Sequence, residues 1–319
     1  MSSPHQSVPN FFIAGAPKAG TTSLYHWLAA HPQVYMSPVK EPCYFSVEAR
    51  PENFSPQYQT MIRQKMADVK SSLDGGSARS QASGVVEDWD DYLRLFAGVT
   101  RETAVGEASV SYLWSGTAAQ GIAERFPNAR ILFILRDPAE RAFSQYLHYV
   151  SLGHAESSFQ KHILACFSSG DEFGPYHPFL EIGFYAKHLQ RYFAVFPREQ
   201  IRVWLYEDTL AQPKDFHRQV MEFLQIETSF VPDSSKRYLE LLVPKMPGIT
   251  KAMIRSGLWE RMRAWTPASL RSLLRKAVYR QRRAVHLAQD DRRFLIDYYR
   301  DDILKLQQLL NRDLSAWLR

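Results

Sequence analysis

The chain has 319 residues, of which 45% are hydrophobic and 23% are charged, a balance that is typical of a globular protein and excludes a disordered chain. Lysine and arginine number 39 against 33 aspartates and glutamates, so the net charge of +6 favours an anionic ligand or surface without demanding nucleic acid. The two cysteines, Cys43 and Cys166, are too few for a disulfide framework or a zinc site.

The N-terminal residues 1–10 are polar and contain no apolar secretory core. No later apolar run is long enough to span a bilayer, and the cysteine content is compatible with a reducing compartment. We therefore expect a soluble, cytoplasmic protein that has no nucleic-acid partner.

Residues 11–23 begin as a short apolar run, turn through two glycines and a proline, and end in hydroxyl residues. This order predicts a strand, a phosphate loop and a helix, because glycines let N–H groups approach an anion and the helix offers its unpaired first-turn donors. Gly15 and Gly20 have the separation seen in nucleotide-triphosphate loops, but Thr21 stands where those loops have lysine. Lys18 supplies the positive charge instead. A phosphate or sulfate site is predicted, with a ligand-free turn as the alternative.

The segment after the first predicted helix is extended, because its prolines exclude a helix. The helix spans residues 22–30, and the extended stretch, 34–45, places Lys40 and Glu41 among apolar residues. The Glu41 carboxylate is either a general base that removes a proton from an acceptor or the partner of a surface ion pair with Lys40.

Residues 50–84 are rich in proline, glutamine, serine and glycine, which predicts a long mobile loop broken by a short helix. This loop either covers an acceptor site or is simply solvated. A helix over 88–96 and a strand ending near 104–109 follow. Ser109 and Tyr112 beyond that strand either contact an acceptor or form a turn.

Residues 130–138 form a continuous apolar run that ends abruptly in charge, as in a buried parallel strand. Ligands of parallel sheets bind beyond the carboxyl ends of the strands, which is where Arg136 falls. Asp137 and Pro138 then begin a helix that carries Ser144 and His148, so Arg136 and Ser144 can together hold a phosphate. Taken alone, Asp137 is also compatible with the Mg²⁺-binding aspartate of an ATPase.

Strands near residues 11, 104, 131 and 201 alternate with predicted helices, which indicates a parallel sheet. The predicted fold is a three-layer αβα domain with a central parallel sheet over 1–240, followed by a helical C-terminal extension over 241–319. Residues 153–180 read as an irregular, partly helical excursion. The basic stretch 251–293 is either an amphipathic helix that packs on the domain or a surface for an acidic acceptor or a membrane.

Four segments together resemble the sulfotransferases that use 3′-phosphoadenosine 5′-phosphosulfate (PAPS), including the heparan-sulfate-type and bacterial enzymes, whose fold is like that of P-loop NTPases. The segments are P-K-x-G-T-T at 17–22, K-E-P-x-Y-F at 40–45, G-E-A-S-x-x-Y-L at 106–113 and L-R-D-P-x-x-R-x-x-S-x-Y-x-H at 135–148. The resemblance covers most of residues 10–240.

The resemblance implies transfer of a sulfuryl group from PAPS to a hydroxyl or amine, with release of adenosine 3′,5′-bisphosphate and without a metal. Glu41 would take the acceptor proton, while Lys18 and His148 would stabilise charge on the transferred group. The donor would be held by Lys18, Ala19, Gly20, Thr21, Thr22, Ser23, Arg136 and Ser144. A short loop with Lys236, Arg237 and Tyr238 would also contact the donor, and the alternative for this loop is a solvated basic turn.

Two other functions are weighed against this one. An ATP/Mg²⁺-dependent phosphotransferase is disfavoured because no lysine follows Gly20. A non-catalytic, nucleotide-dependent protein that binds a membrane surface is supported only by the basic C-terminal stretch. No segment of the sequence indicates whether the acceptor is a small molecule, a lipid or a glycan.

Overall fold

A computed structural model describes residues 8–54, 56–75, 82–155, 158–168, 178–231, 242–246, 248–249, 252–253, 256, 265, 278–281 and 285–319. The chain packs into two units. The first comprises Met1–Arg136, Tyr185–Tyr238 and Gln308–Leu310, and the second comprises Asp137–Phe184, Leu239–Gln307 and Asn311–Arg319. The predicted domain boundary at residue 240 lies outside the described residues and stays a prediction.

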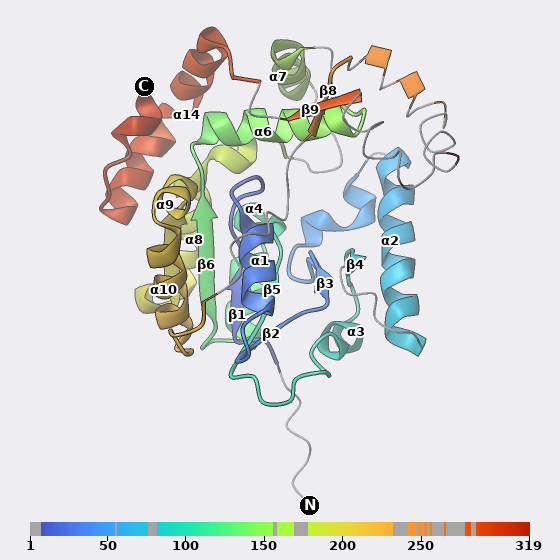
Figure 1. Cartoon of the computed structure of the whole chain (residues 1–319), viewed down its shortest axis with the longest axis vertical. Helices are drawn as coiled ribbons and strands as arrows, with labels where there is room; N and C mark the ends of the chain where they lie inside the picture. Colours follow the sequence, from blue (N-terminus) through green and yellow to red (C-terminus); the bar gives the residue numbers. More distant parts are fainter. Residues whose placement is uncertain are drawn as a thin grey trace, which may run out of the picture. The chain divides into compact units, whose positions relative to one another are not determined.

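The first unit is built on a five-stranded parallel sheet with the strand order β2-β5-β1-β6-β7 (Figure 1). The strands are β1 (Phe11–Ile13), β2 (Val34–Met36), β5 (Ala104–Ala108), β6 (Arg130–Leu135) and β7 (Ile201–Leu205). The side chains of β1 and β5 are fully buried, as expected for a sheet covered on both faces. The strands predicted near residues 11, 104, 131 and 201 are thereby confirmed.

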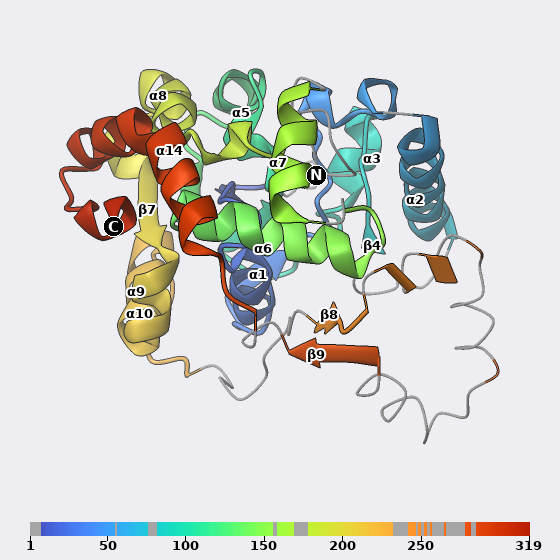
Figure 2. The same ribbon diagram turned by 90° about the horizontal axis from the view of Figure 1, so that it is seen from above.

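Helices cover both faces of this sheet, so the three-layer αβα architecture is confirmed. Figure 2 shows α1 and α10 on one side of the strands and α5 and α8 on the other. The helices of this unit are α1 (Thr21–Ala29), α2 (Pro56–Gly75), α3 (Trp89–Arg94), α4 (Ser111–Trp114), α5 (Ala118–Arg125), α8 (Tyr185–Val195), α9 (Tyr206–Ala211) and α10 (Pro213–Leu224).

The expectation of a long mobile loop over 50–84 is wrong, because α2 runs for 20 residues inside it. Tyr58, Ile62 and Val69 are buried, at spacings of four and seven residues that place them on one helical face. The polar composition belongs to the exposed faces of the helix. A short parallel pair, β3 (Val39–Lys40) with β4 (Ala82–Ser83), flanks the helix in sequence.

The second unit contains α6 (Pro138–Ser151), α7 (Phe159–Ser168), most of α14 (Gln289–Leu310) and an antiparallel pair, β8 (Leu242–Pro244) with β9 (Tyr279–Gln281). The Asp137 carboxylate caps α6 by accepting the amides of Ala139 at 2.9 Å and Glu140 at 3.2 Å, as the Asp-Pro start predicts. Strand β9 corrects the expectation that the stretch 251–293 is helical throughout; most of that stretch lies outside the described residues.

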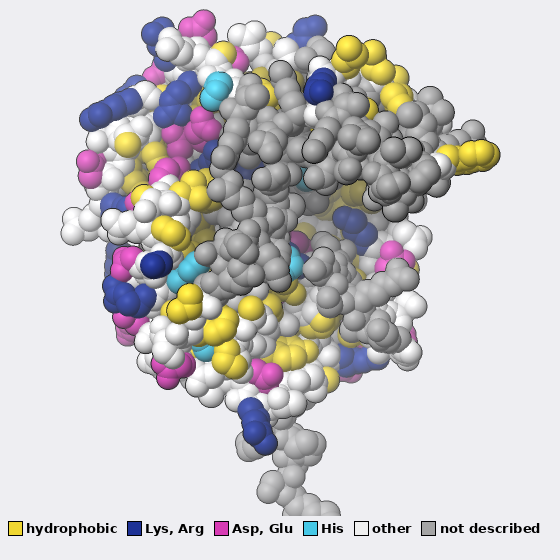
Figure 3. All heavy atoms as spheres, viewed as in Figure 1, with side chains coloured by type: hydrophobic (Ala, Val, Ile, Leu, Met, Phe, Trp, Pro, Cys, Tyr) yellow, Lys and Arg dark blue, Asp and Glu magenta, His cyan; other side chains and the backbone are white. Residues whose placement is uncertain are grey.

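The described surface mixes charges of both signs. Figure 3 shows basic and acidic side chains interspersed over the face that it presents. Within the part of the chain that the structure describes, no helix has the length and apolar character needed to cross a bilayer.

A substitution of Gly15 tests how closely the loop after β1 must approach β6. A Cβ atom at Gly15 would lie 2.6 Å from the backbone nitrogen of Ile134, so one of the two backbones must move. We expect Gly15→Ala to lower the free energy of unfolding by about 1–3 kcal/mol in urea denaturation, as overpacking does. The matched control is Gly75→Ala in α2, where the added methyl group meets nothing within 4 Å. Equal effects of the two substitutions would contradict the close approach.

Candidate active site

The loop between β1 and α1 is held against β6 by backbone hydrogen bonds that continue the strand pairing. The amide of Ala14 donates to the carbonyl of Leu132 at 2.9 Å, and the amide of Ala16 donates to that of Ile134 at 2.9 Å. The chain therefore passes the carboxyl edge of the sheet before it turns into α1, which is where ligands of parallel sheets bind.

The turn itself is built from left-handed residues. Lys18 has a φ of 67° and Gly20 a φ of 94°. Gly20 precedes α1 and offers no side chain that could cap the first-turn N–H groups of the helix. These donors and the positive end of the helix dipole favour an anion. Ala19 is buried, and its amide donates to Ala16 at 3.2 Å, so this amide serves the turn.

The three hydroxyl residues that open α1 differ in exposure. Thr21 is buried, Thr22 is half-buried and Ser23 is exposed. All three lie in the first turn of α1, where the sequence predicts the residues that contact a phosphate or sulfate group.

Arg136 lies beside this loop. It is the first residue after β6, and only 7% of its surface is exposed. Its Nη1 atom donates to the carbonyl of Lys18 at 3.3 Å, and the Tyr185 hydroxyl donates to the carbonyl of Arg136 at 2.9 Å. The structure thus brings the Arg136 guanidinium group to the backbone of Lys18, a residue that lies 118 positions away in the sequence.

Tyr206 completes this cluster and was missed by the sequence analysis. It is the first residue of α9, directly after β7, and its ring centre lies 5.0 Å from the guanidinium carbon of Arg136. A Cβ atom at Gly20 would come within 3.3 Å of the same ring. The available signal was its place directly after a mostly apolar strand, which is also the place of Arg136.

Glu41 follows β3 in a left-handed conformation, with a φ of 62°. Its amide donates to the carbonyl of Ala108 at 2.9 Å, and its Oε2 atom accepts the amide of Val110 at 2.7 Å. Its Oε1 atom pairs with the Lys40 ammonium group, so the ion pair considered from the sequence is present. The side chain is 21% exposed, and each carboxylate oxygen has a further lone pair for an acceptor proton.

A second carboxylate, that of Glu107 in β5, is fully buried. It accepts hydrogen bonds from the hydroxyl groups of Tyr112 at 2.6 Å, Ser109 at 2.7 Å and Tyr92 at 3.2 Å. Burial raises the pKa of Glu107 to about 7. The possibility that Ser109 and Tyr112 contact an acceptor is wrong, because both are fully buried against this carboxylate.

The remaining predicted site residues belong to the second unit or lie outside the described residues. Ser144 and His148 are four residues apart on α6, on one helical face, and belong to the second unit. Ser144 is buried and His148 is half-buried. Their participation in a site with Arg136 stays a prediction. The other three, Lys236, Arg237 and Tyr238, lie outside the described residues.

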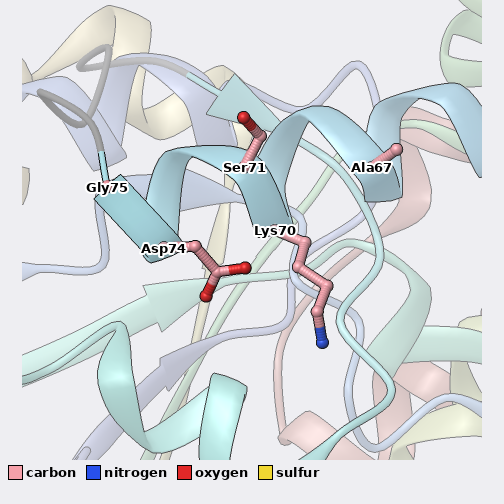
Figure 4. A pocket seen from close by; sticks show the side chains of 5 residues that line it. All are labelled: Ala67, Lys70, Ser71, Asp74 and Gly75. Atoms are coloured by element: carbon pink, nitrogen blue, oxygen red, sulfur yellow. The ribbon is translucent and has the colours of Figure 1, made fainter.

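An open hollow of about 710 Å³ lies on α2 and is lined by Ala67, Lys70, Ser71, Asp74 and Gly75 (Figure 4). Its lining does not include the residues predicted to bind or react. Lys70 pairs with Asp91 at 3.2 Å, so its charge serves the packing of α2 on α3. Within the described ranges, no three His, Cys, Asp or Glu side chains are grouped as metal ligands.

Comparison with known proteins supplies a family. The sequence pattern of the Sulfotransferase family matches residues 9–230. A sulfotransferase from Alicyclobacillus acidocaldarius, known from its crystal structure, is 32% identical, with a TM-score of 0.72, over 98% of this chain and 100% of that one.

Curated relatives are more distant and longer. Human carbohydrate sulfotransferase 15 is 26% identical over 283 residues, which cover 75% of this chain and 46% of that protein. Human bifunctional heparan sulfate N-deacetylase/N-sulfotransferase 3 is 25% identical over 330 residues, which cover 98% of this chain and 31% of that protein. The chain therefore spans less than half the length of these two relatives. Because the family pattern covers more than half of the chain and the bacterial enzyme matches along its whole length, the chain belongs to the sulfotransferase family.

Proposed function

We propose that this protein transfers the sulfuryl group of PAPS to a hydroxyl or amine and releases adenosine 3′,5′-bisphosphate. The observation that carries the proposal is the contact between the loop at Lys18 and Arg136. The backbone turn that is predicted to bind an anion lies beside a guanidinium group at one sheet edge, and the Glu41 carboxylate accepts the Val110 amide just beyond β5 at the same edge. A nucleotide with phosphate groups at both ends of its ribose needs two such cationic sites.

The donor would be bound by two kinds of group. The first-turn N–H groups of α1, with Lys18 and the hydroxyl groups of Thr21 and Thr22, would hold the phosphosulfate. The planar guanidinium of Arg136 suits bidentate contact with the 3′-phosphate, and stacking on Tyr206 limits its rotation. Ser144 on α6 would add a hydroxyl group to the same phosphate.

The chemical step would be an in-line transfer between two oxygen atoms, or from oxygen to nitrogen. Glu41 would accept the proton of the acceptor as the new bond to sulfur forms. Lys18 would stabilise the negative charge that develops on the bridging oxygen of the leaving nucleotide, and His148 would stabilise the sulfuryl group itself. Positioning of the donor and acceptor supplies much of the remaining rate.

A glycan is the acceptor class that we propose. Support comes from the relatives, one named a carbohydrate sulfotransferase and the other a heparan sulfate N-sulfotransferase. Small molecules and lipids are the other outcomes of the test below. Contact with a membrane through the basic stretch 251–293 concerns residues that mostly lie outside the described ranges, and it stays a prediction, as does a cytoplasmic location.

Nucleotide binding tests the donor site. We expect isothermal titration calorimetry to show tighter binding of adenosine 3′,5′-bisphosphate than of ATP with Mg²⁺. Arg136→Ala should weaken binding of the bisphosphate roughly 10- to 100-fold, because a charged hydrogen-bonding partner of one phosphate is lost. The control is Arg218→Ala on α10, where the arginine pairs with Asp215 and Glu222 on the exposed surface. A preference for ATP with Mg²⁺ would support a phosphotransferase and reject our proposal.

Substitution of Glu41 tests the role of the general base. We expect Glu41→Gln to lower the rate of transfer about 10²- to 10⁴-fold, since an amide cannot take the acceptor proton, while bisphosphate binding stays unchanged. Transfer is measured with radiolabelled PAPS, first against heparan sulfate and chondroitin freed of their sulfate groups and then against a cell extract. Glu222→Gln, an exposed substitution on α10, is the control. Full activity of Glu41→Gln would remove Glu41 from the mechanism.

A further inference from the structure

The segment that carries Glu41 is held in an unfavourable backbone conformation. Glu41 has a φ of 62° and Cys43 a φ of 52°, both in the left-handed region that side chains other than glycine rarely adopt. Such residues persist only where the surrounding structure fixes them, and they occur at functional sites. The contacts that fix this turn therefore also fix the direction of the Glu41 carboxylate.

Two buried hydroxyl groups hold the turn in place. The Cys43 amide donates to Ser109 Oγ at 3.1 Å, and the Phe45 amide donates to Tyr112 Oη at 3.4 Å. Beside them, the Glu41 carboxylate accepts the Val110 amide at 2.7 Å. The turn is thus attached to the residues that directly follow β5.

The direction of these hydrogen bonds is set by Glu107. A hydroxyl group has one proton, and the protons of Ser109 and Tyr112 are donated to the Glu107 carboxylate at 2.7 and 2.6 Å. Their lone pairs are then available to the amides of Cys43 and Phe45. A carboxylate is suited to this task because it accepts at both oxygens and donates at neither.

We propose that Glu107 is a positioning residue for Glu41. By accepting both hydroxyl protons, its carboxylate keeps Ser109 and Tyr112 as acceptors for the turn and holds the base in place for proton transfer. The inference rests on the proposed function of Glu41 as the general base. Glu107 itself is fully buried and touches no substrate.

Protonation of Glu107 would reverse one of these bonds. Burial raises its pKa to about 7, so the group gains a proton as the pH falls through neutrality, and one of its oxygens becomes a donor. The hydroxyl group that faces this oxygen must then accept the Glu107 proton, and its own proton rotates toward the turn. There it meets the Cys43 or Phe45 amide, which is also a donor, so that hydrogen bond is lost. The titratable groups that face Glu107 are Glu41, Cys43, Tyr92, Tyr112 and Tyr192. Burial raises the pKa of Cys43 and of the three tyrosines, which keeps them neutral.

Amide hydrogen exchange on the full chain tests the hydrogen-bond arrangement without an acceptor. In the wild type we expect the protection factors of the Cys43 and Phe45 amides to fall, roughly tenfold, as the pH is lowered from 8 to 6. In Glu107→Gln they should be low at pH 8 and independent of pH, because the amide NH₂ group always donates. The control is Tyr92→Phe, which removes a hydrogen bond of the same carboxylate at 3.2 Å but no acceptor of the turn. Wild-type protection that does not change with pH, or wild-type protection in Glu107→Gln, would overturn the inference.

Transfer from radiolabelled PAPS to desulfated heparan sulfate and to a cell extract tests the link to catalysis. We expect Glu107→Gln to lower kcat about 10- to 100-fold at pH 8 and to leave bisphosphate affinity unchanged, since the donor site does not depend on the turn. The acid limb of the wild-type kcat profile near pH 7 should disappear in this variant.

The two proposals fail in different ways. A wild type that transfers nothing from PAPS rejects the proposed function, while the exchange measurement still decides whether Glu107 orders the turn. An active wild type in which Glu41→Gln is inactive but Glu107→Gln keeps full kcat supports the function and overturns the positioning role.

Discussion

The pairing of β1 with β5 on one side and β6 on the other is the interaction on which the site depends. Ile13 is in register with Ala108 and with Leu132, so β1 and β5 end together at one edge, and β6 runs on past them to Leu135. Beyond that edge, β1 continues into the predicted phosphate loop, β6 into Arg136 and β5 into the residues that hold Glu41. A slip of one residue in either pairing would turn every side chain to the opposite face and separate these groups.

Close packing at the loop explains why small residues are needed there. Gly15 leaves no room for a methyl group against the backbone of β6, and Gly20 adopts a left-handed conformation against the ring of Tyr206. The ring of Tyr206 also packs on the guanidinium group of Arg136. The loop, the arginine and the first turn of α9 therefore restrain one another, and a rigid anion site loses little conformational freedom when a ligand binds.

The sheet and the turn from β1 into α1 could be predicted because their signals are local. Apolar runs ending in charge, two glycines at a fixed separation and an Asp-Pro helix start each lie within a few residues of the element that they specify. A short helix was predicted within 50–84, but the full length of α2 was not, because the polar composition of this stretch obscures the helical spacing of Tyr58, Ile62 and Val69. The contacts of Tyr206 and Glu107 could not be predicted, since they join residues that only folding brings near. The Cys43 amide and Ser109, for example, are 66 residues apart in the chain.

The buried carboxylate of Glu107 is costly to the fold, and this cost bears on why it is there. Its pKa of about 7 lies above the ordinary 4.5, so the folded state binds the proton more tightly than the unfolded state. The stability that protonation contributes is fully present below pH 4.5 and is lost as the pH rises through 7, about 3 kcal/mol at 1.36 kcal/mol per pH unit. The ionised form, which alone accepts both hydroxyl protons and so leaves both oxygen atoms as acceptors for the turn, is thus the less stable one. A well-packed apolar side chain in this position would not lower the stability of the fold in this way. Stability therefore does not explain why a carboxylate is buried here, whereas its hydrogen bonds to the two hydroxyl groups that hold the Glu41 turn do.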